Sequence, residues 1–554
     1  MADATHTVVN QSAPLVGYNL FDGNRPLRDA LRFNAPALDT AALSALGATL
    51  GSAPMQLHAR LANVHTPQLH SHDRIGHRLD QVEFHPSYHA LMVAATAAGL
   101  HGSPWTEQGA SPHVLRAAGF MLFTELEPSI LCPISMTYAV TPALRGNAAI
   151  YADWGPKLAS RAYDPAFKLW RDKPGLTMGM GMTEKQGGSD VRANTTRAVP
   201  DSARSVADGS DLWGQRFRLT GHKWFMSAPM CDAFLVLAQA PAGLSCFFLP
   251  RVLPDGSANA IRIQRLKDKL GNQANASSEV EFDDATAWLV GDEGRGVPQI
   301  LEMGTLTRLD CALGTSGLMR QALAIALDHT AQRQVFGKTL LEQPLMRNVL
   351  ADLALESEAA TALSIRLARA FDHAGDAHEA AMARLLTPVA KFWICKRGSA
   401  FAQETMECLG GNGYVEEGGE GIMARIYREM PVNSIWEGAG NIMALDLLRA
   451  LRKADAAAAL ARELAPAQGA HPALDRMAAA LQHRVEQMAT EVQARQLAQD
   501  VALAVQAALL HQTAPAAVFS AFCDSRLAGN WGQSFGTLAA QTDFDTIIAR
   551  AMPR

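Results

Sequence analysis

The spacing of apolar positions changes twice along the chain. Over residues 1 to about 175, apolar residues recur at helical spacing, as in 41–50 and 88–99, and Pro and Gly separate the segments. From about Met182 to Gly291 the pattern shortens to strands with Gly, Pro, Asn and Asp between them. The strands predicted there are 217–220, 234–239, 245–249, 261–265 and 280–282. From about Gly296 onward, long helices rich in Ala and Leu return.

This order of patterns predicts an α+β fold with four parts. The expected parts are an N-terminal helical domain (1–178), an antiparallel β-barrel or sandwich domain (179–293), a helical bundle (294–450) and a C-terminal helical extension (451–554).

Composition and charge exclude several classes of protein. The chain has 554 residues, of which 48% are hydrophobic and 19% charged, so it has apolar mass for several cores and is neither disordered nor collagen-like. The net charge is −5, whereas a polyanion-binding protein usually has a basic footprint. The extension after Leu451 carries nine basic and nine acidic residues, so any contact with nucleic acid needs a local patch.

Several features indicate the cellular setting. No apolar run reaches about 18 residues, because polar and helix-breaking residues interrupt even the stretch 234–250, so no membrane helix is expected. No basic start with an apolar stretch opens the chain, so no signal peptide is expected. Seven scattered cysteines suggest reduced thiols and a cytoplasmic location. Six histidines crowd residues 65–89, but their spacing fits no metal site well.

Two stretches in the strand-rich region suit a flat ligand. Gly181–Asp190 contains two adjacent glycines between Thr183 and Ser189, so its backbone amides can approach a ligand closely, although a plain turn explains the same residues. In Gly221–Ser227, alternation places Phe225 and Ser227 on one face of a strand. An aromatic ring beside a hydroxyl could bind a flat heteroaromatic cofactor. The alternative is that Phe225 packs in the core of the sheet.

Two further stretches lie in the helical part. Arg333–Gly337, with Gln343 after it, predicts a helix that ends at a Gly cap; its Arg could either interact with the helix dipole or bind a pyrophosphate. Glu437 lies between Trp436 and Gly438 in a loop that opens a helix. Desolvation by the indole of Trp436 would raise the pKa of Glu437 toward the range of a general base. The alternative is that Glu437 is a carboxylate at a helix start that interacts with the helix dipole.

Other enzyme classes lack support. No Gly-x-Gly-x-x-Gly follows a strand, which argues against a Rossmann enzyme that uses NAD, and no Gly-x-Ser-x-Gly elbow supports acyl hydrolysis.

In this order, the four stretches resemble the signatures of the acyl-CoA dehydrogenase family over about residues 90–450. The matching residues are the run 182–190, then Arg333, Phe336, Gly337, Gln343, Gly410, Gly411, Gly413, Tyr414, Glu437 and Gly438. The α–β–α order agrees with that family. Within it, the resemblance is closest to the adaptive-response branch linked to DNA alkylation damage, and the long C-terminal extension is a feature of that branch.

The resemblance implies a flavoprotein that contains FAD. Met182, Thr183 and Ser189 would line the flavin and its phosphates, and Phe225 and Ser227 would back the ring. Arg333, Phe336 and Gln343 would hold the FAD of a neighbouring subunit, which implies a homotetramer. Trp436, Glu437 and Asn441 would complete the pocket. Glu437 would remove the α-proton of an acyl-CoA-like thioester while hydride leaves the β-carbon.

The branch also implies binding to double-stranded DNA, with Arg449 and Arg526 at matching positions. The function expected is therefore α,β-dehydrogenation by a DNA-associated protein of the alkylation-damage response. The alternative is an ordinary metabolic acyl-CoA dehydrogenase that does not bind DNA.

Overall fold

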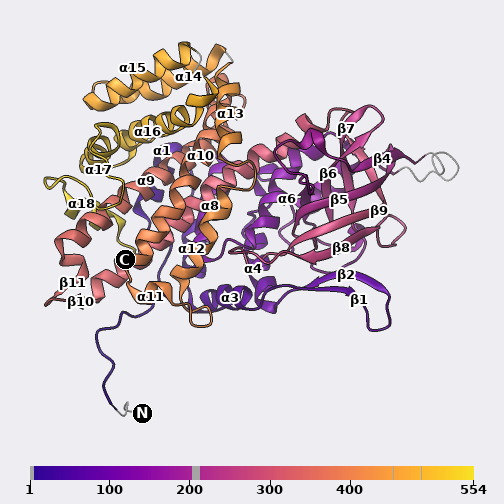
Figure 1. Ribbon diagram of the computed structural model, residues 1–554, viewed down its shortest axis with the longest axis horizontal. Coiled ribbons are helices and arrows are strands. Elements are labelled where there is room, and N and C mark those ends of the chain that lie inside the picture. Colours follow the sequence, from indigo (N-terminus) through magenta and orange to yellow (C-terminus); the bar gives the residue numbers. More distant parts are fainter. Residues whose placement is uncertain (1–4, 202–211, 453, 488–489) are drawn as a thin grey trace. The chain divides into compact units, whose positions relative to one another are not determined.

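The computed structural model describes residues 5–201, 212–452, 454–487 and 490–554. The chain divides into two compact units, which are described separately. The first contains 1–56, 109–126 and 308–554, and the second contains 57–108 and 127–307. Figure 1 labels the elements. Helices α3 (Ala53–Val64) and α8 (Gly296–Gln332) continue from one unit into the other.

The second unit is built on a β-sheet. Its strands are β3 (Met178–Gly181), β4 (Arg197–Pro200), β5 (Arg216–Ser227), β6 (Ala233–Ala240), β7 (Gly243–Pro250), β8 (Ile261–Leu266) and β9 (Ser277–Val290). The strand order is β3-β6-β4-β5-β9-β7, and β7 also pairs with β6, so the sheet closes on itself, with β8 added along β9. Most pairs are antiparallel, as expected, but β6 runs parallel to both β3 and β4.

Helices and a hairpin complete this unit. The helices are α4 (Pro86–Ala97), α6 (Leu131–Leu144) and α7 (Ala148–Leu158). The hairpin of β1 (Gln68–His72) and β2 (Arg78–Glu83) lies within a region for which the apolar spacing predicted mostly helix. Its strands are short and largely exposed, so they carry little apolar alternation that could reveal them.

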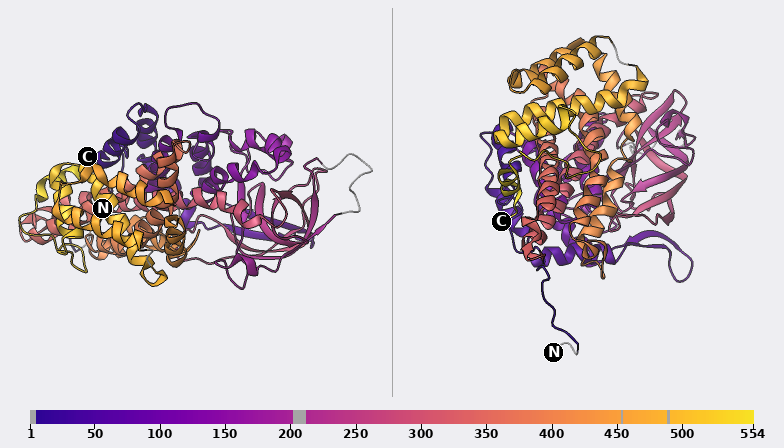
Figure 2. Two further views of the ribbon diagram at one scale, coloured as in Figure 1. Left: turned by 90° about the horizontal axis from the view of Figure 1, so that it is seen from above. Right: turned by 60° about the vertical axis from the view of Figure 1, so that its left-hand side comes forward.

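The first unit is helical. Its helices are α1 (Arg25–Asn34), α2 (Ala41–Leu50), α5 (Pro112–Leu126), α9 (Pro344–Asp372), α10 (Ala377–Glu407), α11 (Gly411–Tyr414), α12 (Ile422–Asn433), α13 (Gly440–Leu451), α14 (Ala454–Leu464), α15 (Pro472–Glu486), α16 (Ala494–Thr513), α17 (Ala516–Phe522) and α18 (Phe544–Ala551). Figures 1 and 2 show α14 and α15 lying beside α16, and α16 in turn packs on α9 and α10. The extension after Leu451 therefore belongs to the same core as the bundle.

The α+β fold class predicted from the sequence is confirmed, whereas the exact four-part division stays a prediction. The structure describes all seven cysteines; none of them forms a disulfide bond, and six are buried. In the described part of the chain, no helix is long and apolar enough to cross a bilayer.

Candidate functional site

In the second unit, a buried ion pair fixes the loop that follows β3. The Glu184 carboxylate accepts hydrogen bonds from Lys223 Nζ at 2.8 Å, Thr196 Oγ1 at 2.6 Å and the Thr195 amide at 2.7 Å. The side chains of Glu184 and Lys223 are both fully buried. The pair ties the loop to β5, so Glu184 holds the loop in place from the inside.

The electrostatics of Glu184 agree with this role. Burial disfavours its charged form, but the Lys223 ammonium and the hydrogen bonds from Thr196 and Thr195 outweigh burial and hold the pKa of Glu184 well below its usual range. Glu184 is therefore ionised at neutral pH and is no candidate for a general base.

The outer side of the same loop is open. Gly187 has a φ of +142°, and a Cβ added at Gly188 would lie 2.4 Å from Thr183 Oγ1. Met182 and Thr183 are half-buried, and Ser189 is exposed. The outer side of the loop is thus exposed backbone with the hydroxyls of Thr183 and Ser189 at its ends. We call this segment, residues 182–190, the cradle; its two glycines let a ligand approach the backbone.

Strand β5 carries Phe225 and Ser227, on the strand predicted for them. Phe225 is 50% exposed, which is unusual for an aromatic side chain in a sheet, and the Ser227 hydroxyl lies 3.3 Å from that of Ser277. The Trp224 amide donates to the Thr183 carbonyl at 2.8 Å, so β5 and the cradle are hydrogen-bonded to each other.

The region of Arg333 departs from the prediction of a helix capped by Gly337. Helix α8 ends at Gln332, and a hairpin follows, made of β10 (Gln334–Val335) and β11 (Lys338–Thr339). Phe336 and Gly337 form its turn with φ values of +51° and +79°. The glycine therefore serves a two-residue turn in place of a helix cap, because two successive left-handed residues match the twist of a hairpin.

The hairpin groups the three residues predicted to hold FAD of a neighbouring subunit. Gln343 Nε2 donates to the Val335 carbonyl at 3.0 Å, and the Arg333 guanidinium donates to the Asn10 carbonyl. Phe336 at the tip is 97% exposed, and Leu345 nearby in the sequence is 84% exposed. Two large apolar side chains are thus left in water on this chain alone.

Glu437 lies in the turn before α13, as predicted. Its φ is +60° and that of Gly438 is +102°, so two successive residues adopt left-handed backbone. A left-handed glutamate is uncommon and strained, and such strain is concentrated at functional sites. Trp436 Nε1 donates to Asn433 Oδ1 at 3.1 Å and so braces the residue before it.

Two cations hold this turn through its backbone. Arg308 Nε donates to the Glu437 carbonyl at 3.0 Å, and Lys391 Nζ donates to the Gly438 carbonyl at 2.5 Å. Asp446 on α13 accepts from Arg308 at 3.1 Å and from Arg384 at 2.7 Å. The two cations therefore fix the main chain of the turn that carries Glu437.

Arg308 and Lys391 were missed by sequence reasoning. Both lie inside long helices and far from any motif. The signal for Lys391 was its position in the apolar run 388–395, where a single buried cation needs a partner. The signal for Arg308 is not visible, because its partner lies 129 positions away.

The remaining predicted residues differ in accessibility. Asn441 is exposed, and its Oδ1 accepts from Arg495 at 2.9 Å. Arg449 is exposed on α13. Arg526, in contrast, is fully buried and forms ion pairs with Asp352 at 2.5 Å and Glu356 at 3.1 Å.

Within each unit, the structure brings the predicted residues into local groups. The cradle and β5 form one group in the second unit; the hairpin and the Glu437 turn form two in the first. In the described residues, no three His, Cys, Asp or Glu side chains are placed to hold a metal ion.

Family models match three parts of the chain. The adaptive response protein AidB N-terminal domain matches residues 10–165, the acyl-CoA dehydrogenase middle domain matches 179–285, and the acyl-CoA dehydrogenase C-terminal domain matches 294–452. AidB of Escherichia coli (strain K12) is 53% identical over 451 residues, which is 81% of each chain.

Solved structures share the fold. The Caenorhabditis elegans protein ACDH-11, in complex with C11-CoA, aligns over 100% of this chain and 94% of its own, with a TM-score of 0.79 and 26% identity. The Bacillus anthracis acyl-CoA dehydrogenase complexed with FAD aligns over 84% of this chain and 82% of its own, with a TM-score of 0.64 and 19% identity, which shows the fold alone. The chain therefore belongs to the acyl-CoA dehydrogenase family of FAD-dependent oxidoreductases, and within it to the AidB branch.

Proposed function

We propose that this protein binds FAD and removes the α-proton and a β-hydride from an acyl-CoA thioester, with Glu437 as the base. The observation that carries the proposal is the turn at Glu437, where a carboxylate stands on strained, left-handed backbone held by two cations. Membership of the acyl-CoA dehydrogenase family supports it.

The second unit fits a flavin. Nothing lies within 4 Å of a Cβ built at Gly187, so the backbone there is open to a ligand, and Phe225 is 50% exposed, with the Lys267 ammonium 4.8 Å from its ring centroid. We propose that Met182, Thr183 and Ser189 hold the ring edge and phosphates and that Phe225 and Ser227 back the ring. The roles of Trp436 and Asn441 in binding FAD stay predictions from the sequence. Bound FAD would accept the hydride.

The chemistry assigned to Glu437 follows from its surroundings. Arg308 and Lys391 donate to the backbone of the turn, and Asp446 balances the charge of Arg308. A base held by its main chain keeps its position while its side chain takes up a proton. The proton that it removes is the one on the carbon next to the thioester carbonyl.

An acyl-CoA is the proposed substrate class. One structural relative, ACDH-11, aligns over the whole chain and was solved with C11-CoA. We therefore expect activity with acyl chains of medium length. Anaerobic addition of acyl-CoAs of increasing length should bleach the yellow holoenzyme, with a maximum near that length. A holoenzyme that no acyl-CoA bleaches would refute the proposal.

We propose further that the active form is a homotetramer. Phe336 and Leu345 leave apolar surface exposed at the hairpin, and Arg333 and Gln343 lie beside it. A neighbouring subunit would cover this surface and receive these residues at its FAD. Phe336→Asp should lower both the molar mass measured by light scattering and the affinity for FAD, whereas Val492→Asp, at an equally exposed site, should change neither. An unaltered tetramer with unaltered FAD affinity would contradict this role.

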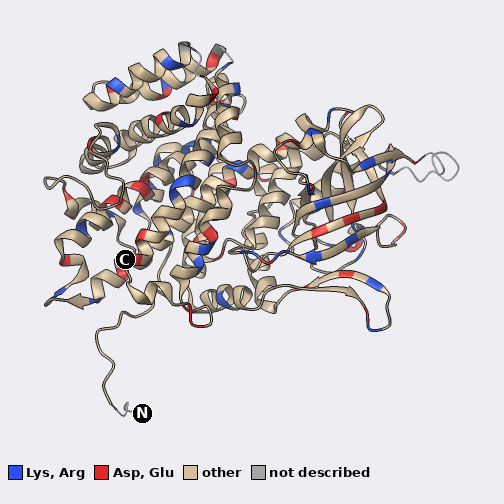
Figure 3. Cartoon of the chain, viewed as in Figure 1, with Lys and Arg blue, Asp and Glu red and all other residues tan. Residues whose placement is uncertain are grey.

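A role with double-stranded DNA in the alkylation-damage response is a second proposal, favoured by membership of the AidB branch and by the exposed Arg449. The buried Arg526 does not support this proposal. A direct contact with phosphate would require its guanidinium to leave Asp352 and Glu356. In the ribbon of Figure 3, residues coloured as Lys or Arg and as Asp or Glu are interspersed over α14 to α16, with no stripe of one sign in this view.

Affinity for duplex DNA measured at several salt concentrations distinguishes a DNA-binding protein from an ordinary metabolic dehydrogenase. Each phosphate contact contributes about −0.9 to the slope of log K against log salt, so Arg449→Ala should make the slope shallower by about one contact. If the protein does not bind duplex DNA, or binds it with an affinity that does not depend on salt, the function is that of an ordinary metabolic acyl-CoA dehydrogenase.

A further inference from the structure

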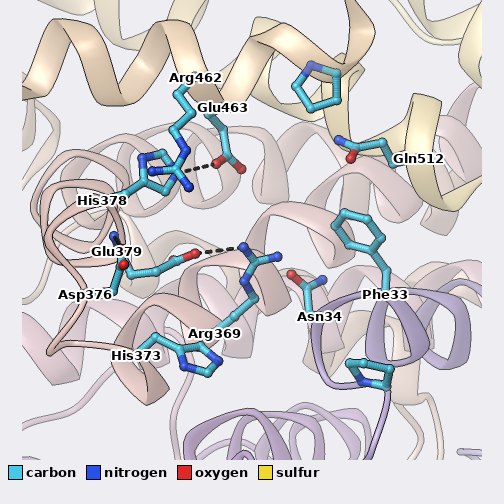
Figure 4. A pocket seen from close by; sticks show the side chains of 12 residues that line it. Phe33, Asn34, Arg369, His373, Asp376, His378, Glu379, Arg462, Glu463 and Gln512 are labelled. Atoms are coloured by element: carbon cyan, nitrogen blue, oxygen red, sulfur yellow. Dashed lines mark hydrogen bonds and ion pairs between the residues drawn. The ribbon is translucent and has the colours of Figure 1, made fainter.

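Two groups of polar contacts in the first unit involve residues without an assigned role. The first group lines a cavity of about 550 Å³ between α1, α9, α10, α14 and α16 (Figure 4). There Glu379 accepts a hydrogen bond from Arg369 at 2.7 Å. Glu463 accepts one from Arg366 at 2.6 Å and lies 3.4 Å from His378. These pairs join α9, α10 and α14, so the charged side chains of the cavity hold the extension against the bundle.

The second group of contacts joins the N-terminal segment 10–13 to the hairpin that carries Phe336. Asn10 Nδ2 donates to the Gln334 carbonyl at 2.8 Å, and the Gln334 amide donates to Asn10 Oδ1, also at 2.8 Å. Two further hydrogen bonds join the segment to the end of α8: Ser12 Oγ with His329 Nδ1 at 2.7 Å, and the Ala13 amide with Gln332 Oε1 at 2.9 Å. The segment therefore follows the end of α8 and reaches the first strand of the hairpin.

The place of Gln334 in the hairpin explains why a side chain can pair with its backbone. Gln334 stands opposite Thr339, next to the pair in which the Leu340 amide donates to the Arg333 carbonyl at 2.8 Å. Because hydrogen-bonded and non-hydrogen-bonded positions alternate in an antiparallel pair, the amide and carbonyl of Gln334 point away from Thr339. The Asn10 side chain pairs with both groups, as a third strand would. A hairpin with two residues in each strand is marginal by itself, so this contact supports it.

Asn10 also contacts Arg333 through its backbone. Its φ of +56° is left-handed, which asparagine tolerates better than most other side chains do. The Asn10 carbonyl accepts a hydrogen bond from the Arg333 guanidinium. A guanidinium has five N–H donors, so this bond orients Arg333 and leaves donors for a phosphate. One residue thus fixes both the hairpin and its arginine.

We propose that Asn10 is a positioning residue for FAD, which holds the hairpin and Arg333 in the geometry that binds the FAD of a neighbouring subunit. This inference rests on the function proposed above for the hairpin. Asn10 acts through Gln334 and Arg333 and needs no contact with the cofactor. Its loss should therefore weaken FAD binding and leave the chemical step unchanged, because Arg308 and Lys391 hold the turn of Glu437.

Asn10→Gly tests the side chain alone, because glycine accepts the same left-handed backbone. We expect the Kd for FAD, measured by flavin fluorescence on dilution of the holoenzyme, to rise about tenfold, since two hydrogen bonds are lost. The value of kcat at saturating FAD should equal that of the parent. Hydrogen exchange at the Gln334 amide, followed by mass spectrometry, should become faster, while exchange in α9 stays at the parental rate.

Two further variants show whether the Asn10 amide is the cause. Asn10→Asp keeps an acceptor for the Gln334 amide but loses the donor, so its Kd for FAD should lie between those of the parent and Asn10→Gly. Gln11→Gly makes the same replacement at the next position, where the side chain accepts from Asn412 at 3.2 Å instead of contacting the hairpin. Gln11→Gly should bind FAD like the parent.

Three results would overturn the inference. A parental Kd in Asn10→Gly, together with weakened FAD binding in Phe336→Asp, would remove the role of Asn10 and leave that of the hairpin intact. An equal loss in Gln11→Gly would show that flexibility of the segment, and not the Asn10 amide, is the cause. If Phe336→Asp itself binds FAD like the parent, the function proposed for the hairpin fails, and the role of Asn10 fails with it.

Discussion

At the scale of single residues, the turn at Glu437 depends on a cation that binds its backbone carbonyl. Arg308 donates to the Glu437 carbonyl, and its charge is balanced by Asp446. Arg384 also pairs with Asp446, with its Nη2 at 2.7 Å, but no hydrogen bond links it to the turn. The two arginines therefore form a matched pair of test positions.

We expect Arg308→Ala to lower kcat by about 10- to 100-fold, because small displacements of a catalytic group have effects of that size. Arg384→Ala loses an ion pair with the same aspartate and should keep most of the parental kcat. Steady-state kinetics of the two variants, at equal flavin content, provide the comparison. Equal losses in both would show that Asp446, and not the carbonyl contact, is what matters.

The buried carboxyl of Glu125 makes the free energy of unfolding depend on pH. Burial raises the pKa of its carboxyl to about 8, against weaker opposing effects of Arg320 and Asn24. The folded state thus binds a proton that the unfolded chain releases near its ordinary pKa. Its contribution to stability is complete below pH about 4.5 and is lost as the pH rises through about 8.

Glu125→Gln should remove this dependence. Between pH 5 and pH 8 the parent should lose on the order of a few kcal/mol of unfolding free energy relative to the variant. Urea unfolding at the two pH values, followed by tryptophan fluorescence, measures the difference. A constant gap between the two proteins across this range would contradict the assigned burial effect.

At the scale of elements, the connection between the cradle loop and β5 rests on the Glu184–Lys223 pair. Lys223→Met leaves a buried carboxylate without its cation and should cost roughly 3–5 kcal/mol. Adding Glu184→Gln to Lys223→Met should restore part of this stability. Lys185→Met, at an exposed neighbouring position, should cost little.

Chemical denaturation of the four proteins gives these values, and FAD affinity should fall in the Lys223 variant because the cradle is loosened. If Lys223→Met were as stable as the parent, the ion pair would not be what holds the loop.

The elements that could be predicted are those whose apolar pattern is set by burial. The strands from β5 to β9 and helix α2 were found from their periodicity, because one face of each lies in a core. The hairpin at Phe336 could not be found this way, since its turn residues are exposed and its strands have two residues each. The motif residues there were predicted, but the backbone that presents them was not.

The same limit applies within the site. The positions of Phe225 on a strand and Glu437 in a turn followed from local pattern, whereas the contacts of Arg308 and Lys391 depend on which helices pack together. Pairing at a distance leaves no trace in one sequence, so the structure was needed to find it.

At the scale of the whole molecule, the chain combines an acyl-CoA dehydrogenase framework with an extension that packs as an ordinary helical layer. The buried Arg526 exemplifies this, because its ion pairs with Asp352 and Glu356 tie the extension to α9. The extension therefore contributes to the core of the first unit, whatever it binds at its surface.

The central claim is that Glu437 removes a proton from the carbon next to the thioester. A thioester whose β-carbon is replaced by sulfur isolates that step, since no hydride can leave from it. In D₂O, the holoenzyme should exchange the α-protons of this compound for deuterium, as measured by mass spectrometry. Glu437→Gln should slow the exchange by about 10²- to 10⁴-fold, and Glu407→Gln, at an exposed position, should not. Exchange at the parental rate in Glu437→Gln would contradict the account.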